Sequence, residues 1–381
     1  MRRFLAVFVT ALVLTGCGLR PPEELTMPAL DSERAEQRVQ RLWARNTGAG
    51  VRKVHLELTP AVTSGHIYVA DHRGRVDARE RDSGSRHWRV DTGDRIGTGL
   101  YAGFGLVLYG TRDGEAVALD AEDGTEKWRA RIGSELFSPP AAGAGLVVFQ
   151  TMDGRVVALE RDTGEERWSH DTSLPILILR AGARPVISGN RVFAGFANGR
   201  VVALDTETGS PAWERRIAEP TGRSELERLV DVTGELVLQG NALYAATFQG
   251  NIVRMDHQSG RPLWERPMST HAPFAHDGNR LYLADSNGNV MALDQRTGNE
   301  LWRQDRLSDR GGLTGVVVHN GHVVTGDSEG WLHWLDGETG HLVMRHQHQP
   351  QGLAATPVER DGVLYVLGRR GWLAAYELRE R

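Results

Sequence analysis

The sequence contains one cysteine in 381 residues, Cys17, so no disulfide can form within the chain. Stability must therefore come from a core, and a globular region of about 340 residues can bury roughly three quarters of its unfolded surface. Beyond Leu14 no apolar run is long enough to cross a bilayer, and no segment shows sustained helical periodicity. The net charge of −4 gives no electrostatic basis for binding nucleic acid. These absences favour a β-rich domain that is stabilised by its core.

The first residues have the pattern of a secretory signal peptide. Arg2 and Arg3 precede an apolar run over residues 4–14, which is shorter than the roughly 20 residues that a membrane-spanning helix needs. The segment LTGC (14–17) resembles the bacterial lipobox, which implies a signal peptide over 1–16 and lipidation of Cys17. An ordinary cleavage site followed by a buried or free cysteine is the alternative. Residues 17–38 are rich in Pro, Glu and Arg, which is typical of a flexible tether.

An internal repeat accounts for the remaining chain. Its frame is visible in RDGEAVALDAEDGTEKW (112–128), MDGRVVALERDTGEERW (152–168) and NGRVVALDTETGSPAW (198–213): a turn glycine, alternating apolar residues, an acid, a second glycine and a tryptophan. The first glycine of each copy stands at position 74, 114, 154, 199, 250, 288, 330 or 371. Repeats of this length with several strands each are typical of propeller blades.

Each copy reads as strands joined by tight turns. Asp-Gly at 113–114 and Asn-Gly at 198–199 lie between apolar runs and predict hairpins in which both central residues take positive φ. The acid of each copy is expected to accept backbone N–H bonds in the second turn, and its glycine to supply a left-handed residue. Eight equivalent carboxylates are therefore turn residues and not a catalytic pair.

The predicted fold is all-β: an eight-bladed β-propeller over residues 39–381 with four antiparallel strands per blade. The eighth copy begins at Gly371 and lacks a second turn and a tryptophan. Trp43 stands alone ahead of the first copy, so residues 40–47 are expected to complete the last blade as an N-terminal strand and remove an open edge. The repeated tryptophans are expected to pack between neighbouring blades.

Other candidate motifs fit the repeat better than a catalytic function. GDSEG (326–330) matches the nucleophile elbow, but Gly330 is a repeat glycine, so Ser328 is expected in a hairpin turn. His346 and His348 lack an identifiable third ligand and are expected at a solvated strand end. The glycines of GTGLYAG (97–103) lack the strand–helix context of a dinucleotide loop.

The copies are unequally spaced, and the irregular ones indicate where function lies. Successive first glycines are separated by 40, 40, 45, 51, 38, 42 and 41 residues. The two long intervals correspond to 169–186 and 214–235, which flank the fourth blade and are expected to form one surface patch. The apolar stripe 176–179, followed by Arg180, is typical of a protein-binding anchor. Alternatively, 176–179 is the inner strand of the fourth blade.

The blade frame resembles the pyrroloquinoline-quinone (PQQ)-type repeat, with its A-L-D-x-x-T-G-x-x-x-W pattern. Quinoprotein dehydrogenases use this repeat to hold a quinone and Ca²⁺, so a periplasmic PQQ-dependent dehydrogenase, or another small-molecule-binding propeller, is the alternative function. It would need a stacking tryptophan and a set of Glu, Asn and Asp at the mouth of the central channel. No non-repeated set of that kind is found in the sequence.

The lipobox, the polar spacer, the eight copies and the segments PTGRSELERLVDV (220–232) and GDSEGWLHWLD (326–336) together resemble the BamB family. Members of that family are lipoprotein subunits of the Bam complex, which folds β-barrel proteins into the outer membrane. An L-x-L-R motif and an acidic D-V-D stretch contribute to their contact with BamA. The first matches Leu177 to Arg180, and the second is half matched by Asp231-Val232, with Thr233 replacing the second acid.

The resemblance implies a non-enzymatic scaffold without a cofactor, anchored through Cys17 to the periplasmic face of the outer membrane. It would bind BamA and assist the assembly and insertion of β-barrel proteins. Leu177 and Leu179 would supply apolar anchors, while Arg180 and Asp231 would fix orientation through charge-assisted hydrogen bonds. A subsidiary expectation is that blade edges receive strands of unfolded β-barrel clients by β-augmentation.

Overall fold

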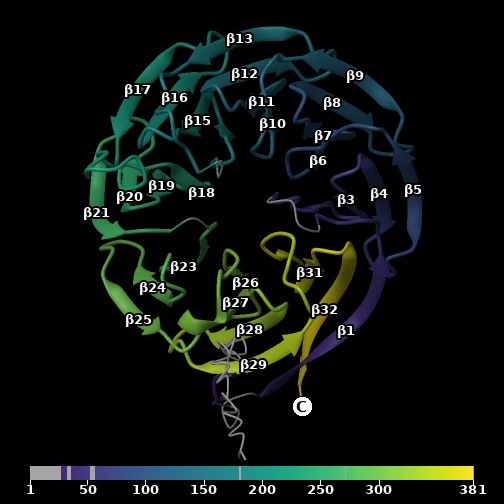
Figure 1. Ribbon diagram of the computed structural model, residues 1–381, viewed down its shortest axis with the longest axis vertical. Coiled ribbons are helices and arrows are strands. Elements are labelled where there is room, and N and C mark those ends of the chain that lie inside the picture. The colour runs from purple at the N-terminus through teal and green to yellow at the C-terminus, as the bar shows by residue number, and fades with distance from the viewer. Residues whose placement is uncertain (1–26, 32–35, 52–55, 180–181, 271, 381) are drawn as a thin grey trace, which may run out of the picture.

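The computed structural model describes residues 27–31, 36–51, 56–179, 182–270 and 272–380. Cys17 and the signal peptide expected over 1–16 lie outside these ranges. The described residues form eight four-stranded antiparallel sheets arranged as blades around an axis, as predicted (Figure 1). Within the described ranges, no helix has the length and apolar character needed to span a bilayer.

The first four blades follow one another along the chain, each from its inner strand to its outer strand. Blade one consists of β2 (Ala61–Val62), β3 (His66–Ala70), β4 (Arg75–Glu80) and β5 (Arg86–Asp91). Blade two consists of β6 (Tyr101–Gly103), β7 (Leu106–Gly110), β8 (Glu115–Asp120) and β9 (Glu126–Arg131). Blade three consists of β10 (Ala141–Gly143), β11 (Leu146–Gln150), β12 (Arg155–Glu160) and β13 (Glu166–Asp171). Blade four consists of β14 (Val186–Ser188), β15 (Arg191–Gly195), β16 (Arg200–Asp205) and β17 (Pro211–Arg216).

The last four blades complete the ring. Blade five consists of β18 (Val232–Gln239), β19 (Ala242–Thr247), β20 (Gly250–Asp256) and β21 (Pro262–Met268). Blade six consists of β22 (Ala275–Asp277), β23 (Arg280–Ala284), β24 (Val290–Asp294) and β25 (Glu300–Gln304), and the 3₁₀ turn η2 (Ser308–Arg310) follows it. Blade seven consists of β26 (Val317–His319), β27 (His322–Gly326), β28 (Trp331–Asp336) and β29 (Leu342–Gln347). Blade eight consists of β30 (Val358–Arg360), β31 (Val363–Leu367), β32 (Trp372–Glu380) and β1 (Gln37–Asn46).

Blade eight is closed by the N-terminal strand, as the position of Trp43 predicts. Strand β1 pairs antiparallel with β32, for example Ala44 with Ala374, and lies outermost in its sheet. The strand begins at Gln37, two residues before the expected start of the domain. Trp43 is buried against the core between blades eight and one. The two ends of the propeller therefore stabilise each other through one sheet.

The hairpin turns between the second and third strands differ from the expected geometry. Gly114 and Gly199 have φ of 82° and 72°, but Asp113 and Asn198 are not left-handed. The N–H of Gly114 donates to the carbonyl of Thr111 at 3.3 Å, and the N–H of Thr111 donates to Glu115 at 2.9 Å. This is a three-residue loop with one left-handed glycine, so the prediction of two positive-φ residues is wrong.

The repeated tryptophans and second glycines dock neighbouring blades. Trp168 of blade three donates its indole N–H to the carbonyl of Thr206 in blade four at 2.8 Å. A Cβ on Gly209, which has φ of 69°, would lie 2.6 Å from the Trp168 ring. The same pairing joins Trp43 to Gly84, Trp88 to Gly124, Trp128 to Gly164, Trp213 to Gly260, Trp264 to Gly298 and Trp302 to Gly340. The glycine is required because the indole ring occupies the space of a side chain.

Blade seven carries Met344 at this repeat position, because blade eight has no second turn for an indole to cover. Met344 instead packs in a cluster with Leu378 and Val39 of blade eight.

The repeat acids serve their turns as predicted: Asp205 accepts the N–H of Glu207 at 3.0 Å, and Asp336 accepts that of Thr339 at 2.8 Å. The apolar core lies mainly between neighbouring blades, because each cluster of buried side chains combines residues of adjacent sheets.

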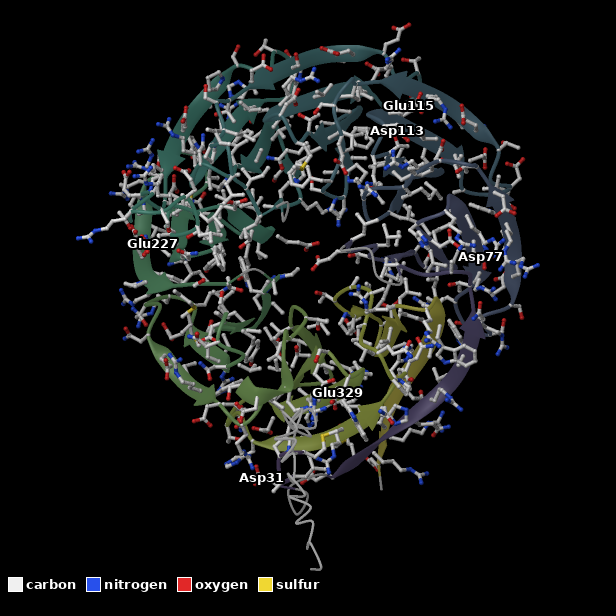
Figure 2. The ribbon with its side chains drawn as sticks, in the orientation of Figure 1. Asp31, Asp77, Asp113, Glu115, Glu227 and Glu329 are labelled. Carbon is white, nitrogen blue, oxygen red and sulfur yellow. The ribbon has the colours of Figure 1, made fainter. Side chains whose placement is uncertain are left out.

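The segment ahead of β1 contacts the outside of blades six and seven. The N–H of Asp31 donates to Leu342 at 2.8 Å, and its carboxylate pairs with Arg306 at 2.6 Å. Arg345 donates to the carbonyl of Pro28 at 2.8 Å, and Leu30 packs against the cluster between the two blades. Figure 2 shows Asp31 at the outer edge of the ring. Residues 27–31, which fall within the expected tether, thus lie on the propeller.

Candidate partner-binding site

The two connectors on either side of blade four meet on one face of the propeller. Connector 172–185 joins β13 to β14, and connector 217–231 joins β17 to β18. The backbone N–H of Leu179 donates to the Asp231 carboxylate at 2.7 Å. Arg184 forms a backbone bridge with Glu235, and their side chains pair at 4.0 Å. The structure therefore joins the two segments that the irregular spacing singles out.

The apolar stripe in connector 172–185 is divided between solvent and interior. Residues 176–179 do not form a strand, and the inner strand β14 begins only at Val186, so the inner-strand alternative is wrong. Ile176 is fully exposed and Leu177 is 38% exposed. Ile178 lines a small cavity, and Leu179 lines the axial channel. Arg180 lies outside the described residues.

Connector 217–231 is held by a capping arrangement around Glu227, which Figure 2 shows at the outer side of the ring. The Glu227 carboxylate accepts the N–H of Arg223 at 2.6 Å and of Ser224 at 3.2 Å, and the N–H of Glu227 donates to the Ser224 hydroxyl at 3.2 Å. These backbone hydrogen bonds lower the pKa of Glu227. Gly222, with φ of 125°, leaves no room for a Cβ beside Glu227. The folded connector presents Leu226, which is 66% exposed.

Asp231 lies inside the molecule, contrary to the expectation that it orients a partner from the surface. It is 3% exposed, because the chain enters the inner strand β18 at the next residue. Burial raises its pKa to about 6, with the Leu179 N–H acting in the opposite direction. Its role in this structure is to hold the 172–185 connector through Leu179. Thr233 is also buried and donates to the carbonyl of Thr270 at 2.6 Å, so its position belongs to the interior too.

Leu226 escapes prediction from the sequence, although it stands in the mixed-charge run 224–229. A single apolar residue between charged neighbours gives no periodic signal. Its exposure depends on the turn that Glu227 stabilises, and that turn is visible only in three dimensions.

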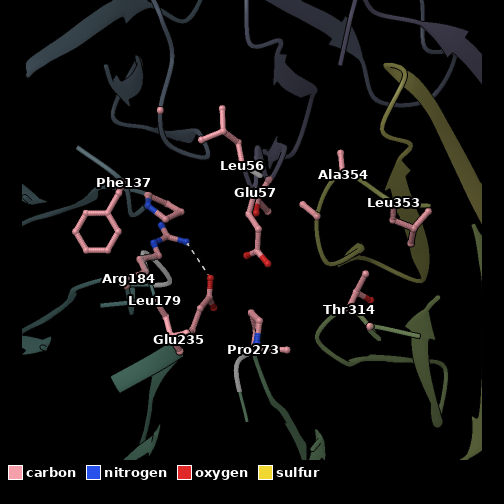
Figure 3. Close-up of a pocket in the computed structure, with 18 of the residues that line it drawn as sticks. Leu56, Glu57, Phe137, Leu179, Arg184, Glu235, Pro273, Thr314, Leu353 and Ala354 are labelled. Carbon is pink, nitrogen blue, oxygen red and sulfur yellow. Dashed lines mark ion pairs between the residues drawn. The ribbon is translucent and has the colours of Figure 1, made fainter. Parts of the chain in front are cut away.

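The axial channel contains a cavity of ≈ 350 Å³ beside the joined connectors (Figure 3). Figure 3 shows Glu57 pointing into it, near the Arg184–Glu235 pair. The Glu57 side chain is exposed to the channel, and the protein surrounding the channel raises its pKa by reducing its solvation, with the negative charge of Glu235 acting in the same direction. None of the described lining residues is Trp, Asn or Asp. The described lining therefore does not match the donor set that a quinone and Ca²⁺ would require.

The remaining sequence motifs have structural roles. The Ser328 hydroxyl donates to the carbonyl of Arg310 at 2.9 Å and lies in the β27–β28 turn, as expected. His348 is buried, with its nitrogens 2.9 Å from the Tyr376 hydroxyl and 2.9 Å from the Trp372 carbonyl. Burial lowers its pKa to about 4. The prediction of a solvated end is thus wrong for His348.

Eight blades, joined at seven of their eight junctions by tryptophan–glycine docking, define a PQQ-type β-propeller, and the joined connectors give it a candidate protein-binding face. A family model described as outer membrane protein assembly factor BamB matches residues 72–304 and 286–380. The chain belongs to this family. It is 40% identical over 374 residues to outer membrane protein assembly factor BamB of Pseudomonas aeruginosa, covering 98% of each chain.

Solved structures agree with this assignment. The crystal structure of BamB from Moraxella catarrhalis matches with a TM-score of 0.81 and 25% identity, over 89% of this chain and 99% of that chain. Quinohemoprotein alcohol dehydrogenase from Comamonas testosteroni matches with a TM-score of 0.71 but only 15% identity, over 89% of this chain and 76% of that chain. The second likeness shows the fold alone.

Proposed function

We propose that the chain is a non-enzymatic scaffold of the Bam complex that binds BamA and assists the assembly and insertion of β-barrel proteins into the outer membrane. Membership of the BamB family supports this function. The observation that carries the proposed binding site is the Asp231–Leu179 hydrogen bond, which joins the two connectors into one surface. Lipidation of Cys17 would hold this surface at the periplasmic face of the outer membrane.

The exposed apolar residues support a protein-binding role for this surface. Of the seven large apolar side chains exposed in the described residues, three lie on the two connectors: Ile176, Leu177 and Leu226. Apolar side chains held on preformed loops make good anchors, because little conformational entropy is lost on binding. Arg180 follows the apolar stripe in the sequence and would add charge-assisted hydrogen bonds to a partner. Leu179 and Asp231 would act indirectly, because their hydrogen bond fixes the connector to the interior of the propeller.

The proposed site is tested by recovery of BamA with the chain from detergent-solubilised envelopes. We expect Arg180→Ala and the double variant Leu177→Ala/Leu226→Ala each to lower BamA recovery about tenfold, which corresponds to about 1.4 kcal/mol of binding free energy. Leu301→Ala is the matched control, because Leu301 is an exposed leucine on the outer strand of blade six and should leave recovery unchanged. Recovery equal to wild type in both connector variants would contradict the site.

The non-enzymatic character is tested separately by adding pyrroloquinoline quinone and Ca²⁺ to the purified chain. We expect no rise in melting temperature and no dye-linked dehydrogenase activity. Either signal would favour the quinoprotein alternative.

A further inference from the structure

We propose that blade one carries a binding site for a divalent transition metal ion, with Zn²⁺ as its natural type, formed by His66, Glu80 and His87. The side chains come from three adjacent strands, β3, β4 and β5, at one end of the sheet. Each offers one ligand atom, and these atoms all lie within 4.8 Å of one another. The site is remote in sequence from the connectors proposed to bind BamA.

The distances fit a tetrahedral ion. His66 Nε2 lies 3.5 Å from Glu80 Oε1, and His87 Nδ1 lies 3.4 Å from the same oxygen. Ligands at about 2.0–2.1 Å from a tetrahedral Zn²⁺ are separated from one another by about 3.4 Å. Two of the three ligand–ligand distances therefore already match a tetrahedral ion, and the third is no more than 4.8 Å. Two imidazoles and one carboxylate would leave the fourth position to water.

A second carboxylate stands behind one of the ligands. His87 Nε2, the nitrogen that faces away from Glu80, lies 3.9 Å from Glu122 Oε1 of blade two. This distance is too long for a hydrogen bond, but the Glu122 side chain is exposed, so a small movement would let it accept the Nε2–H of a ligating His87, fix its tautomer and increase its basicity. The side chains of His66 and His87 are 25% and 27% exposed, so solvent ions can reach them while the sheet holds them in place.

The sheet register explains how the three side chains meet. His66 and Glu80 are direct partners across β3 and β4. The β4–β5 pairing is interrupted by a bulge between Ala78 and Arg79, opposite His87, which directs the His87 side chain to the Glu80 side of the sheet.

In other blades the equivalent acid pairs with a lysine or an arginine. Asp120 pairs with Lys127 at 2.8 Å, Glu160 with Arg167 at 2.6 Å, and Asp205 with Arg191 at 3.0 Å. Each of these partners carries a permanent charge and cannot ligate a metal at neutral pH. Blade one instead places two imidazoles on the carboxylate, and unprotonated imidazole is the ligand that Zn²⁺ prefers.

Blade seven provides a natural comparison. His322 pairs with Asp336 in the same register as His66 with Glu80, but Val343 stands where blade one has His87. One imidazole and one carboxylate are too few ligands for a stable Zn²⁺ site. If these histidines only replaced a permanent cation beside the acid, His66 and His322 would respond to Zn²⁺ in the same way. A metal site predicts a response in blade one only.

The test is an isothermal calorimetric titration of ZnCl₂ into the full chain. The chain is purified without a polyhistidine tag and freed of metal by chelation. We expect one Zn²⁺ per chain. The variants His66→Ala and His87→Val should each weaken binding by about tenfold or more, and Glu122→Gln by about tenfold, because ligands and the groups that orient them both contribute. His322→Ala is the matched control and should bind as wild type does. Circular dichroism of the metal-free variants checks that they fold.

A second measurement uses only the wild-type chain. Histidine acylation mapped by mass spectrometry should show that Zn²⁺ protects His66 and His87 and leaves His322 reactive. Affinity that is equal in wild type and in His66→Ala/His87→Val, or protection that is equal at His322, would overturn the proposal.

Discussion

At the residue scale, burial decides what Asp231 does. A carboxylate next to an exposed apolar stripe looks like a polar contact for a partner, but Asp231 accepts the Leu179 N–H from inside the fold. Its Oδ1 atom has no hydrogen-bond partner among the described residues. The ionised form is consequently poorly compensated, and its pKa rises to about 6. The residue keeps the two connectors together at a cost in stability.

This cost predicts a pH-dependent effect of Asp231→Asn. Because the folded pKa, about 6, lies above the ordinary value of 3.8, the favourable contribution of the protonated group is fully present below 3.8 and is lost as the pH rises through 6. A pKa difference of this size corresponds to at most about 3 kcal/mol. We expect the free energy of unfolding of Asp231→Asn to exceed that of wild type by about 1–3 kcal/mol at pH 7.5. Most of this gain should vanish at pH 4.

Denaturant unfolding at the two pH values measures this difference. If the variant is less stable by the same margin at both, the carboxylate's bond to Leu179 outweighs its desolvation, and the argument from burial fails.

At the element scale, closure of the ring depends on β1. The strand contributes the outer edge of blade eight, and Trp43 covers Gly84 of blade one in the way that the repeat tryptophans of blades one to six cover the glycine of the next blade. Its indole N–H donates to the carbonyl of Arg81 at 3.0 Å. Trp43 thus links a strand of blade eight to a turn of blade one, and Arg45 of the same strand donates to the carbonyl of Ser83 in that turn at 2.9 Å. Other contacts between the two blades include the Arg81–Asp361 ion pair and the shared core that contains Tyr365 and Ile67.

We therefore expect Trp43→Ala to destabilise the propeller by about 3–5 kcal/mol, the usual cost of removing a buried tryptophan. The neighbouring Leu42 lies on the same strand but is 39% exposed, so Leu42→Ala should cost no more than about 0.5 kcal/mol. Chemical unfolding followed by tryptophan fluorescence of the remaining indoles gives both values. Similar losses in the two variants would show that β1 is held by its backbone pairing and not by Trp43.

At the scale of the whole molecule, the position of residues 27–31 decides where the chain leaves the propeller toward Cys17. Asp31 pairs with Arg306 of the connector after blade six and lies 3.2 Å from His341 of blade seven. The Arg306 hydrogen bond lowers the pKa of Asp31 despite some desolvation, and His341 contributes in the same direction. Connectors 172–185 and 217–231 flank blade four, whereas residues 27–31 contact blades six and seven (Figure 1). Residues 27–31, which lead to the proposed anchor in the sequence, and the proposed binding face thus lie on different blades.

Arg306→Ala should release this segment without unfolding the blades. Arg306 also donates to the carbonyl of Ala29 at 3.1 Å, so its loss removes two contacts of the segment. We expect hydrogen exchange of residues 27–31 to accelerate, while the unfolding free energy falls by no more than about 1 kcal/mol, as is usual for a surface ion pair. Arg303→Ala, which removes a surface pair with Glu300 on β25, is the control. Unchanged exchange in Arg306→Ala would show that Leu30 and the bond to Leu342 hold the segment unaided.

Much of this architecture follows from sequence alone, because a repeated unit repeats its physics. The repeat has a glycine that must accept an indole, an acid that closes a turn and alternating apolar residues at regular spacing. The number of blades, the ring closure by the strand around Trp43 and the two irregular connectors can therefore be predicted from the sequence. Family membership follows from the same pattern together with the segments at 220–232 and 326–336.

The tertiary structure alone decided which side chains of the connectors face solvent. Ile176 and Leu177 point outward, Leu179 lines the channel and Asp231 is buried, although the four stand in similar sequence surroundings. It also brought His66, Glu80 and His87 to one point, because the cross-strand register and the bulge that recurs at this place in blades one to seven set their side chains together. Repeats fix local turns and strand order through short-range sterics, whereas the exposure of connector side chains depends on tertiary packing, and the convergence of side chains from three strands depends on the cross-strand register.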